Sequence, residues 1–252
     1  MASSTDRKLV RGSLVVRSAL WIGVCAGIAL AATAAQATGV VPDNGSGTIA
    51  LPPGDYQAVA SVITDGLPLG ASIDVTAWLK PTGAVEAAGG LLGGNVETWN
   101  PAVLDLELTG TGVLAGFTRS ISVTGVFVET QSGPRTPGTS PQNIAQDMAM
   151  MQGQVTGDPD FDLLRITAGT GFGMPSPGQT TLTDLGGGNW FVDSFFDINY
   201  RIDFVGAPGG ALAGMSGSTT ATDRYTFVPE PPATALGAIA LASLLVRRRC
   251  GR

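Results

Sequence analysis

A two-residue alternation runs from Trp190 to Phe204 and strongly limits what this chain can fold into. The odd positions include Asp193, Asp197 and Asp203, whereas the even positions are almost all apolar. Successive side chains point to opposite faces only in a β-strand, so the pattern predicts a strand with one buried and one solvent-facing side. The even positions are Trp190, Val192, Ser194, Phe196, Ile198, Tyr200, Ile202 and Phe204.

Shorter runs of the same kind recur through residues 38–227, separated by turn signals such as Gly186-Gly187-Gly188-Asn189. In one of them Ile121, Val123 and Phe127 are expected to share a face. Strands at this spacing are typical of an antiparallel β-sandwich or a jelly-roll-like domain, so we expect an all-β fold. The other predicted strands are Tyr56–Thr64, Ile73–Leu79, Leu104–Leu108, Asp147–Val155, Phe161–Thr167 and Ser216–Phe227.

Two stretches of the predicted domain fit the strand pattern less well. Residues 131–143 are polar and Pro-rich, which predicts a long surface loop. A short helix near Asn143–Met151 is an alternative to the strand, and we prefer the strand.

Charge is distributed unevenly along the chain. Residues 38–227 contain six Lys and Arg against 18 Asp and Glu, which leaves a formal charge of −12 on the predicted domain. A surface this acidic repels phosphate backbones, so nucleic acid is not an expected partner. An acidic surface instead favours solubility or the binding of divalent cations.

The predicted domain lacks the residues that several classes of catalysis require. The chain has no histidine, and its two cysteines, Cys25 and Cys250, lie outside the predicted domain. Ser-His-Asp and Cys-His nucleophiles and His-based zinc sites are therefore excluded. Gly169–Gly173 is Gly-rich, but Pro175 and Pro177 follow where a phosphate-binding loop would start its helix. We expect no cofactor other than a possible calcium ion.

Alternate aspartates form the best candidate for a metal site. Asp158, Asp160 and Asp162 could offer carboxylate oxygens to calcium. The spacing does not fit an EF-hand, because Leu163 and Gly169 stand where its glycine and final glutamate belong. An acidic turn without metal is the alternative.

Carboxylate-based glycan hydrolysis is the remaining enzymatic possibility. Asp193, Asp197 and Asp203 project from one strand face, and Glu97 and Glu107 lie elsewhere. Acidic residues that alternate along a strand are usually a solvated face, so we do not expect an enzyme.

Aromatic side chains outside the apolar sets could stack on sugar rings. Trp78 and Phe191 lie opposite the apolar sets of their strands, and Trp99 lies near a turn. Packing in the core is the alternative for each of them.

The N-terminus follows the plan of a secretory signal peptide. Arg7, Lys8, Arg11 and Arg17 precede an apolar run over residues 19–32. The small residues Ala35 and Ala37 then mark a cleavage site, so residues 1–37 form the expected signal peptide. An uncleaved anchor is the alternative, but the run is short of the 20 or so apolar residues that a membrane span needs.

The C-terminus, residues 228–252, combines three elements. Val228-Pro229-Glu230-Pro231 opens it, and the prolines there predict an extended segment that is neither strand nor helix. Residues 233–246 are apolar helix formers, and Arg247-Arg248-Arg249 follow. The arginines are expected to stay cytoplasmic, which places the acidic domain across the membrane. An ordinary single-pass anchor is the alternative.

This Pro-Glu-Pro motif, apolar helix and Arg cluster resemble the PEP-CTERM sorting signal of Gram-negative-type bacteria. The resemblance covers about the last 25 residues and implies processing by an exosortase, a membrane-embedded cysteine protease. Such proteins tend to occur in organisms that make exopolysaccharide. The run Phe195–Phe204 also resembles segments of other exported bacterial proteins without known activity.

We therefore expect an exported cell-surface or extracellular-matrix protein, with a role in the envelope or in biofilm. Its partners would be the export machinery, an exosortase-type protease, exopolysaccharide and, through the C-terminal helix before processing, the membrane. A carbohydrate-binding module is the first alternative, and a carboxylate-based glycan hydrolase is the second.

Overall fold

The computed structural model describes residues 39–42, 54–136 and 138–230, which lie within one compact unit, Ala37–Glu230. These residues contain eleven strands and two short 3-10 turns, and no α-helix long and apolar enough to cross a membrane. The strands are β1 Val40–Pro42, β2 Gly54–Ile63, β3 Ile73–Lys80, β4 Ala84–Ala88, β5 Asn95–Gly110, β6 Thr118–Ser132, β7 Gln142–Thr156, β8 Phe161–Ala168, β9 Pro177–Gly186, β10 Asn189–Gly206 and β11 Ser216–Pro229, with 3-10 turns at Gly112–Leu114 and Thr170–Phe172.

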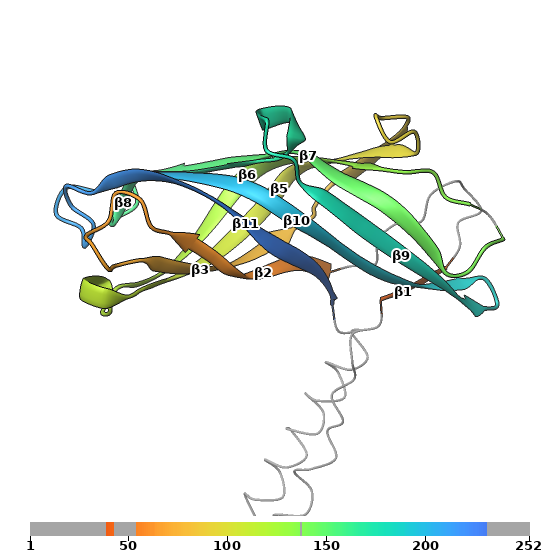
Figure 1. Cartoon of the computed structure of the whole chain (residues 1–252), viewed down its shortest axis with the longest axis horizontal. Helices are drawn as coiled ribbons and strands as arrows, with labels where there is room; N and C mark the ends of the chain where they lie inside the picture. The colour runs from red at the N-terminus through yellow and green to blue at the C-terminus, as the bar shows by residue number, and fades with distance from the viewer. Residues whose placement is uncertain (1–38, 43–53, 137, 231–252) are drawn as a thin grey trace, which may run out of the picture. The chain divides into compact units, whose positions relative to one another are not determined.

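All strand pairs are antiparallel, and together they close into a ring (Figure 1). Eight strands pair in the order β10-β11-β2-β3-β5-β6-β7-β8, and β8 returns to β10. The result is an elongated barrel whose inward-facing side chains form the core. The prediction of an all-β antiparallel fold is confirmed.

The sandwich or jelly-roll arrangement is not confirmed, because the strands form one closed sheet and not two facing ones. Alternation along a strand marks one buried and one exposed face, and both architectures produce that pattern. The pairings that close the ring distinguish them: β8 with β10, from Tyr200↔Ala168 to Gly206↔Phe161, and β9 between β7 and β10. The β8–β10 and β7–β9 contacts join strands that are not consecutive, and no local sequence pattern signals them.

At two places around the barrel wall, two consecutive strands lie one after the other beside the same neighbouring strands. β8 pairs with the second halves of β7 and β10, and β9 continues beside their first halves. In the same way β3 and β4 pair with the second and first halves of β5. One end of the barrel is therefore built by β4, β9 and the starts of β5, β7 and β10.

The inward face of β10 is the one predicted. All even positions from Trp190 to Phe204 are buried, whereas the odd positions are exposed or half-buried. The strand predictions for β2, β3, β5, β7, β8 and β11 are confirmed, and the strand at Asn143–Met151 was the correct choice over a helix. The loop predicted over residues 131–143 is shorter at both ends, because Gln131 and Ser132 belong to β6 and Gln142 and Asn143 belong to β7.

The prediction for β6 is wrong in its phase. Ile121 and Val123 point inward, but Val126 and Val128 are the buried residues beyond them, and Phe127 is only half-buried. Gly125 adds one residue to β6 at this point, with a φ of +69° that favours glycine. This bulge moves every later side chain to the opposite face.

The start of the C-terminal motif is also part of the sheet. Val228 and Pro229 pair with Asp55 and Gly54 as the last residues of β11. The prediction that proline excludes a strand here is wrong, because a proline at the end of a strand needs to donate no ladder hydrogen bond. The predicted boundary at residue 227 therefore lies just inside the strand.

Most of the signal and sorting predictions lie outside the described residues. This holds for residues 1–37, with Ala35 and Ala37, and for Pro231 and Arg247–Arg249.

Candidate functional site

The three aspartates predicted to hold calcium contact an arginine and the backbone. Arg119 Nη2 donates to Asp158 Oδ2 at 2.6 Å, and Arg119 Nε lies 3.8 Å from Asp160 Oδ2. Asp158 Oδ1 accepts the backbone N–H of Asp160 at 2.9 Å, while Asp162 is exposed. Although burial raises it, the hydrogen bonds from Arg119 and the backbone hold the pKa of Asp158 below its usual value.

An arginine therefore lies between Asp158 and Asp160. Within residues 39–42, 54–136 and 138–230 no three or more acidic, Cys or His side chains gather as a metal site would require. The calcium site stays a prediction, and the contacts favour the alternative of an acidic turn.

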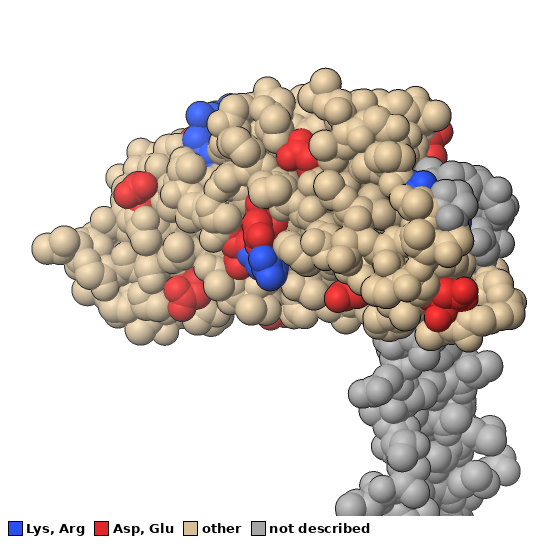
Figure 2. Space-filling view, turned by 45° about the vertical axis from the view of Figure 1, so that its right-hand side comes forward, with Lys and Arg blue, Asp and Glu red and all other residues tan. Residues whose placement is uncertain are grey.

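The aspartates of β10 lie on its outward face, as predicted. Arg224 holds Asp197 with two hydrogen bonds of 2.7 Å and lowers the pKa of that carboxyl. Arg165 contacts Asp203 at 2.9 Å. These are cross-strand ion pairs on the barrel wall, an arrangement typical of a solvated face. Figure 2 shows acidic groups set apart among uncharged ones on one face of the barrel, with few basic groups.

Trp78 lies on the outside of the barrel, as its place opposite Ala77 and Leu79 predicts. It is half-buried in a shallow groove on the outer wall, with a volume of about 460 Å³. We call this the wall groove and define it by six of its lining residues: Trp78, Lys80, Asp105, Glu107, Ser120 and Ser122.

Strand register assembles the wall groove. Trp78 pairs with Asp105 across β3 and β5, and Asp105 pairs with Ser122 across β5 and β6. Lys80 Nζ contacts Asp105 Oδ2 at 2.7 Å, and Ser122 Oγ donates to the same carboxylate. Although burial raises it, these contacts hold the pKa of Asp105 below its usual value, so the groove keeps a fixed anion beside an indole ring.

The other two aromatic candidates differ from Trp78. Trp99 is 0% exposed and packs on Tyr56, with ring centroids 5.9 Å apart. It therefore cannot offer an external stacking surface. Phe191 is 42% exposed on the outer face of β10, away from any residue of the wall groove.

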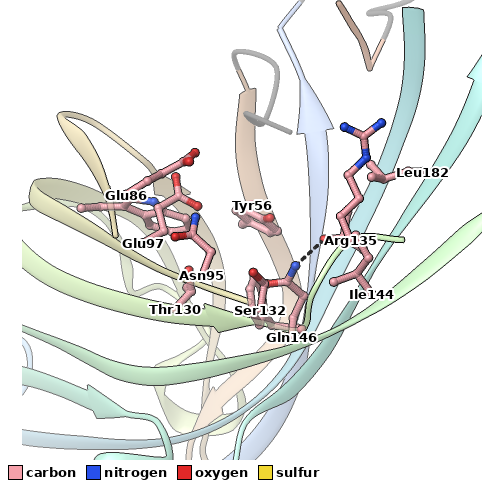
Figure 3. A pocket seen from close by; sticks show the side chains of 14 residues that line it. Tyr56, Glu86, Asn95, Glu97, Thr130, Ser132, Arg135, Ile144, Gln146 and Leu182 are labelled. Carbon is pink, nitrogen blue, oxygen red and sulfur yellow. Dashed lines mark hydrogen bonds between the residues drawn. The ribbon is translucent and has the colours of Figure 1, made fainter. Parts of the chain in front are cut away.

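A second hollow, the end pocket, opens inside the barrel at the end built by β4, β9 and the starts of β5, β7 and β10 (Figure 3). Its volume is about 60 Å³, far below the 300 Å³ or more of typical small-molecule sites. Its polar lining side chains are Glu86, Asn95, Glu97, Thr130, Ser132, Arg135, Gln146 and Thr180, and its aromatic ones are Tyr56, Trp99 and Phe196.

Two carboxylates face each other at one side of the end pocket. Glu86 and Glu97 are directly opposed in the β4–β5 ladder, and Figure 3 shows their carboxylates side by side. Burial raises the pKa of Glu97, the indole of Trp99 opposes this change, and the charge of Glu86 adds to it. Like charges at directly opposed positions destabilise a sheet.

The deeper polar groups form a hydrogen-bonded chain. Tyr56 Oη and Thr180 Oγ1 each lie 2.9 Å from Ser194 Oγ, and Gln146 Nε2 donates to Thr180 Oγ1 at 3.0 Å. Burial raises the pKa of Tyr56. The chain satisfies these buried groups without a ligand.

Arginine occupies the opposite side of the pocket. Figure 3 shows Arg135 beside Leu182, across the hollow from Glu86 and Glu97. Its guanidinium carbon lies 4.7 Å from the ring centroid of Trp190. The pocket thus has an acidic side and a basic side.

The sequence pattern pointed to Trp78 and Glu107 of the wall groove and to Glu97 and Trp99 of the end pocket, but not to the other residues of either site. Glu86 lies on β4 and Thr180 on β9, two strands that were not predicted. The polar residues at inward positions of β5 and β6, such as Asn95 and Thr130, were the available signal. Without the strand phase, that signal could not be distinguished from a solvated face.

Comparison with protein-family models, with curated proteins and with solved structures finds no match to this chain.

Proposed function

We propose that this chain is an exported cell-surface or matrix protein whose barrel binds a polysaccharide in the wall groove and is not an enzyme. One observation carries the proposal. Trp78 lies on the outer wall of the barrel, beside the paired Lys80 and Asp105, in a hollow of about 460 Å³.

The chemistry of the groove suits a sugar ring. An indole face offers apolar area to the C–H side of a pyranose, and the carboxylates and hydroxyls around it can exchange hydrogen bonds with sugar hydroxyls. The volume lies within the range of small-molecule sites. Because the groove is on an open wall, a long polymer can cross it without threading into a cavity.

The location rests on the two ends of the chain. A signal peptide over residues 1–37 would direct export, and the motif from Val228 to Pro231 with Arg247–Arg249 would direct processing by an exosortase-type protease. The C-terminal helix would hold the protein in the membrane until then. Release to the surface would place the acidic barrel among exopolysaccharide.

Binding tests the proposal most directly. Titration of the full chain with purified exopolysaccharide should show saturable binding, and Trp78→Ala should weaken it about tenfold or more. Phe191→Ala removes an exposed aromatic outside the groove and serves as the matched control. Equal affinities for the wild type and Trp78→Ala would refute the site.

Processing tests the location. A chain tagged at both ends should lose both tags, and the remaining protein should be found outside the inner membrane. A full-length product that keeps both tags inside the cell would contradict export and sorting.

Glycan hydrolysis is the second candidate, because Glu86 and Glu97 form a carboxylate pair in a hollow. The hollow of about 60 Å³ does not admit a sugar ring between them, which favours binding over hydrolysis. An assay for new reducing ends in the polysaccharide should stay negative. Release that disappears in Glu97→Gln would establish the hydrolase instead.

A further inference from the structure

A third hollow lies on the outer wall of the barrel, over β7, β8, β10 and β11. Its volume is about 430 Å³, which lies within the range of small-molecule sites. None of the described residues that line it is acidic. We call it the arginine groove and define it by six of its lining residues: Gln152, Arg165, Thr167, Phe172, Arg201 and Thr220.

Strand register brings these side chains together. Thr167 of β8 pairs with Gln152 of β7 and with Arg201 of β10, and Arg201 pairs with Thr220 of β11. The neighbours of Thr167 and Arg201 along their strands belong to the core, so this row faces outward. Arg165 lies two residues before Thr167, on the same face of β8.

The two arginines share one carboxylate. Arg165 Nη2 and Arg201 Nη2 lie 2.9 and 3.2 Å from the same oxygen, Asp203 Oδ2. Although burial raises it, hydrogen bonds from Ser218 and Arg165 hold the pKa of Asp203 below its usual value, so one negative charge faces two positive ones. Each guanidinium has five N–H donors, so both arginines keep donors for a ligand.

A buried hydroxyl gives a second, independent indication of a ligand. Thr167 is 6% exposed, and its Oγ1 has no hydrogen-bond partner among the described residues. Thr167 lines the groove beside Arg201, so this hydroxyl lies on the groove side of the sheet. Buried polar groups are almost always hydrogen-bonded, so an oxygen of a ligand in the groove is the expected partner.

The lining favours a carboxylate that is carried on a sugar ring. A planar carboxylate matches the fork of a guanidinium and carries the one negative charge that the groove lacks. Phe172 is 37% exposed and can offer its apolar face to the C–H side of a ring. Gln152 and Thr220 can exchange hydrogen bonds with ring hydroxyls.

We propose that the arginine groove is a second binding site that takes a uronic acid unit. The carboxylate contacts Arg165 and Arg201, the hydroxyl of Thr167 donates to one of its oxygens, and the ring lies against Phe172. The choice of a sugar as the carrier of the carboxylate rests on the proposed polysaccharide binding.

The wall groove would repel the same unit, because it sets Asp55, Asp105 and Glu107 against Lys80. The two grooves also lie on different strands of the ring. They would therefore bind different sugar units, neutral ones in the wall groove and acidic ones in the arginine groove.

Calorimetric titration of the full chain with an oligogalacturonate and with its methyl ester tests this site. The free acid should bind at least about tenfold more tightly, because the ester has lost the charge. Arg165→Gln and Arg201→Gln should each remove this preference. Arg224→Gln is the matched control, because Arg224 is an outward-facing arginine that pairs with Asp197 and does not line the groove.

Thr167→Val removes the hydroxyl and keeps the shape of the side chain. It should weaken binding of the free acid about tenfold, because the hydroxyl bonds a charged group. The thermal unfolding temperature of the free protein should not fall, because that hydroxyl bonds nothing there. An affinity equal to that of the wild type, or a clear fall in the unfolding temperature, would overturn this role of Thr167.

The other outcomes separate this site from the proposed function. If acid and ester bind equally and Trp78→Ala weakens both, the arginine groove is wrong and polysaccharide binding in the wall groove stands. If the acid is preferred but Trp78→Ala leaves exopolysaccharide binding unchanged, the wall groove fails and the arginine groove stands. If inorganic phosphate binds as tightly as the oligogalacturonate, the sugar has no role and the uronic acid assignment is overturned. If neither oligogalacturonate nor exopolysaccharide binds, both proposals fail.

Discussion

The two halves of the barrel interior differ in what fills them. At the end where β8 pairs with β10, Phe161 packs edge-to-face on Phe117 and Phe204, with centroids 6.2 Å apart in each pair. At the other end the inward positions hold Glu97, Thr130 and other polar groups around a hollow. β5, β6, β7 and β10 run through both halves, whereas β3 and β8 in the apolar half are replaced by β4 and β9 in the polar half.

This contrast predicts that the two halves contribute differently to the stability of the barrel. Apolar burial stabilises a fold in proportion to the area removed from water, and in the apolar half it comes from fully buried rings such as Phe161 and Phe204. Buried polar groups contribute little net stability even when satisfied, and an opposed carboxylate pair reduces it. Apolar residues at both ends would bury more apolar surface, so we expect the polar half to add less to the stability of the barrel than the apolar half does.

The largest effect is expected in the apolar half. Phe161→Ala removes a fully buried ring and should lower the free energy of unfolding by about 3–5 kcal/mol. Urea denaturation followed by circular dichroism measures it. A loss below about 1 kcal/mol would mean that the burial of this ring contributes little to stability.

A smaller loss is expected from the hydrogen-bonded chain in the polar half. Tyr56→Phe removes only the hydroxyl that bonds Ser194 and should cost about 1 kcal/mol. Ser194→Ala in the same background should add less than it does alone, because the two changes break one contact. Full additivity in the double-mutant cycle would show that the chain is not coupled.

The smallest expected effect is a gain in the free energy of unfolding, not a loss. Glu97→Gln should raise the stability at neutral pH by about 0.5 kcal/mol, because it removes one of two opposed charges. The raised pKa of Glu97 means that the folded state holds this proton more tightly than the unfolded chain does. The penalty is therefore absent below the ordinary glutamate pKa and grows as pH rises through the folded value.

The advantage of Glu97→Gln should accordingly vanish in acid, as thermal unfolding across a pH series can measure. Glu129→Gln should show no such dependence. A Gln variant that is less stable at neutral pH would show that the carboxylate is favourably paired.

The sequence predicts which face of a single strand is buried, but it does not predict which strands pair. The alternation from Trp190 to Phe204 predicted the inward face of β10 residue by residue, and Trp78 was correctly placed outside. The bulge at Gly125 was missed, because one inserted residue changes the phase without changing composition. Closure of the barrel depends on the pairing of β8 with β10 and of β7 with β9, contacts that no local pattern records.

The sites were less predictable than the fold for the same reason. The wall groove and the end pocket are made by cross-strand neighbours, such as Trp78 with Asp105 and Glu86 with Glu97. Each neighbour lies on a different strand, so its identity depends on register.

The join between β2 and β11 is a further case in which register decides. Backbone pairing covers only Gly54–Gln57, and beyond it Asp223 accepts the N–H of Ala60 and the hydroxyl of Ser61 at 3.0 and 2.8 Å. A side chain that replaces a backbone partner in this way follows from the three-dimensional fit of the strands, so sequence patterns do not reveal it.

Chemical-shift mapping of the full chain with purified exopolysaccharide tests the proposed binding site most directly. Shifts should change at Trp78 and the other residues of the wall groove, while Phe161 and Phe204 in the apolar half stay unchanged. Shifts that spread over the whole barrel, or that are confined to the apolar half, would contradict the proposed site.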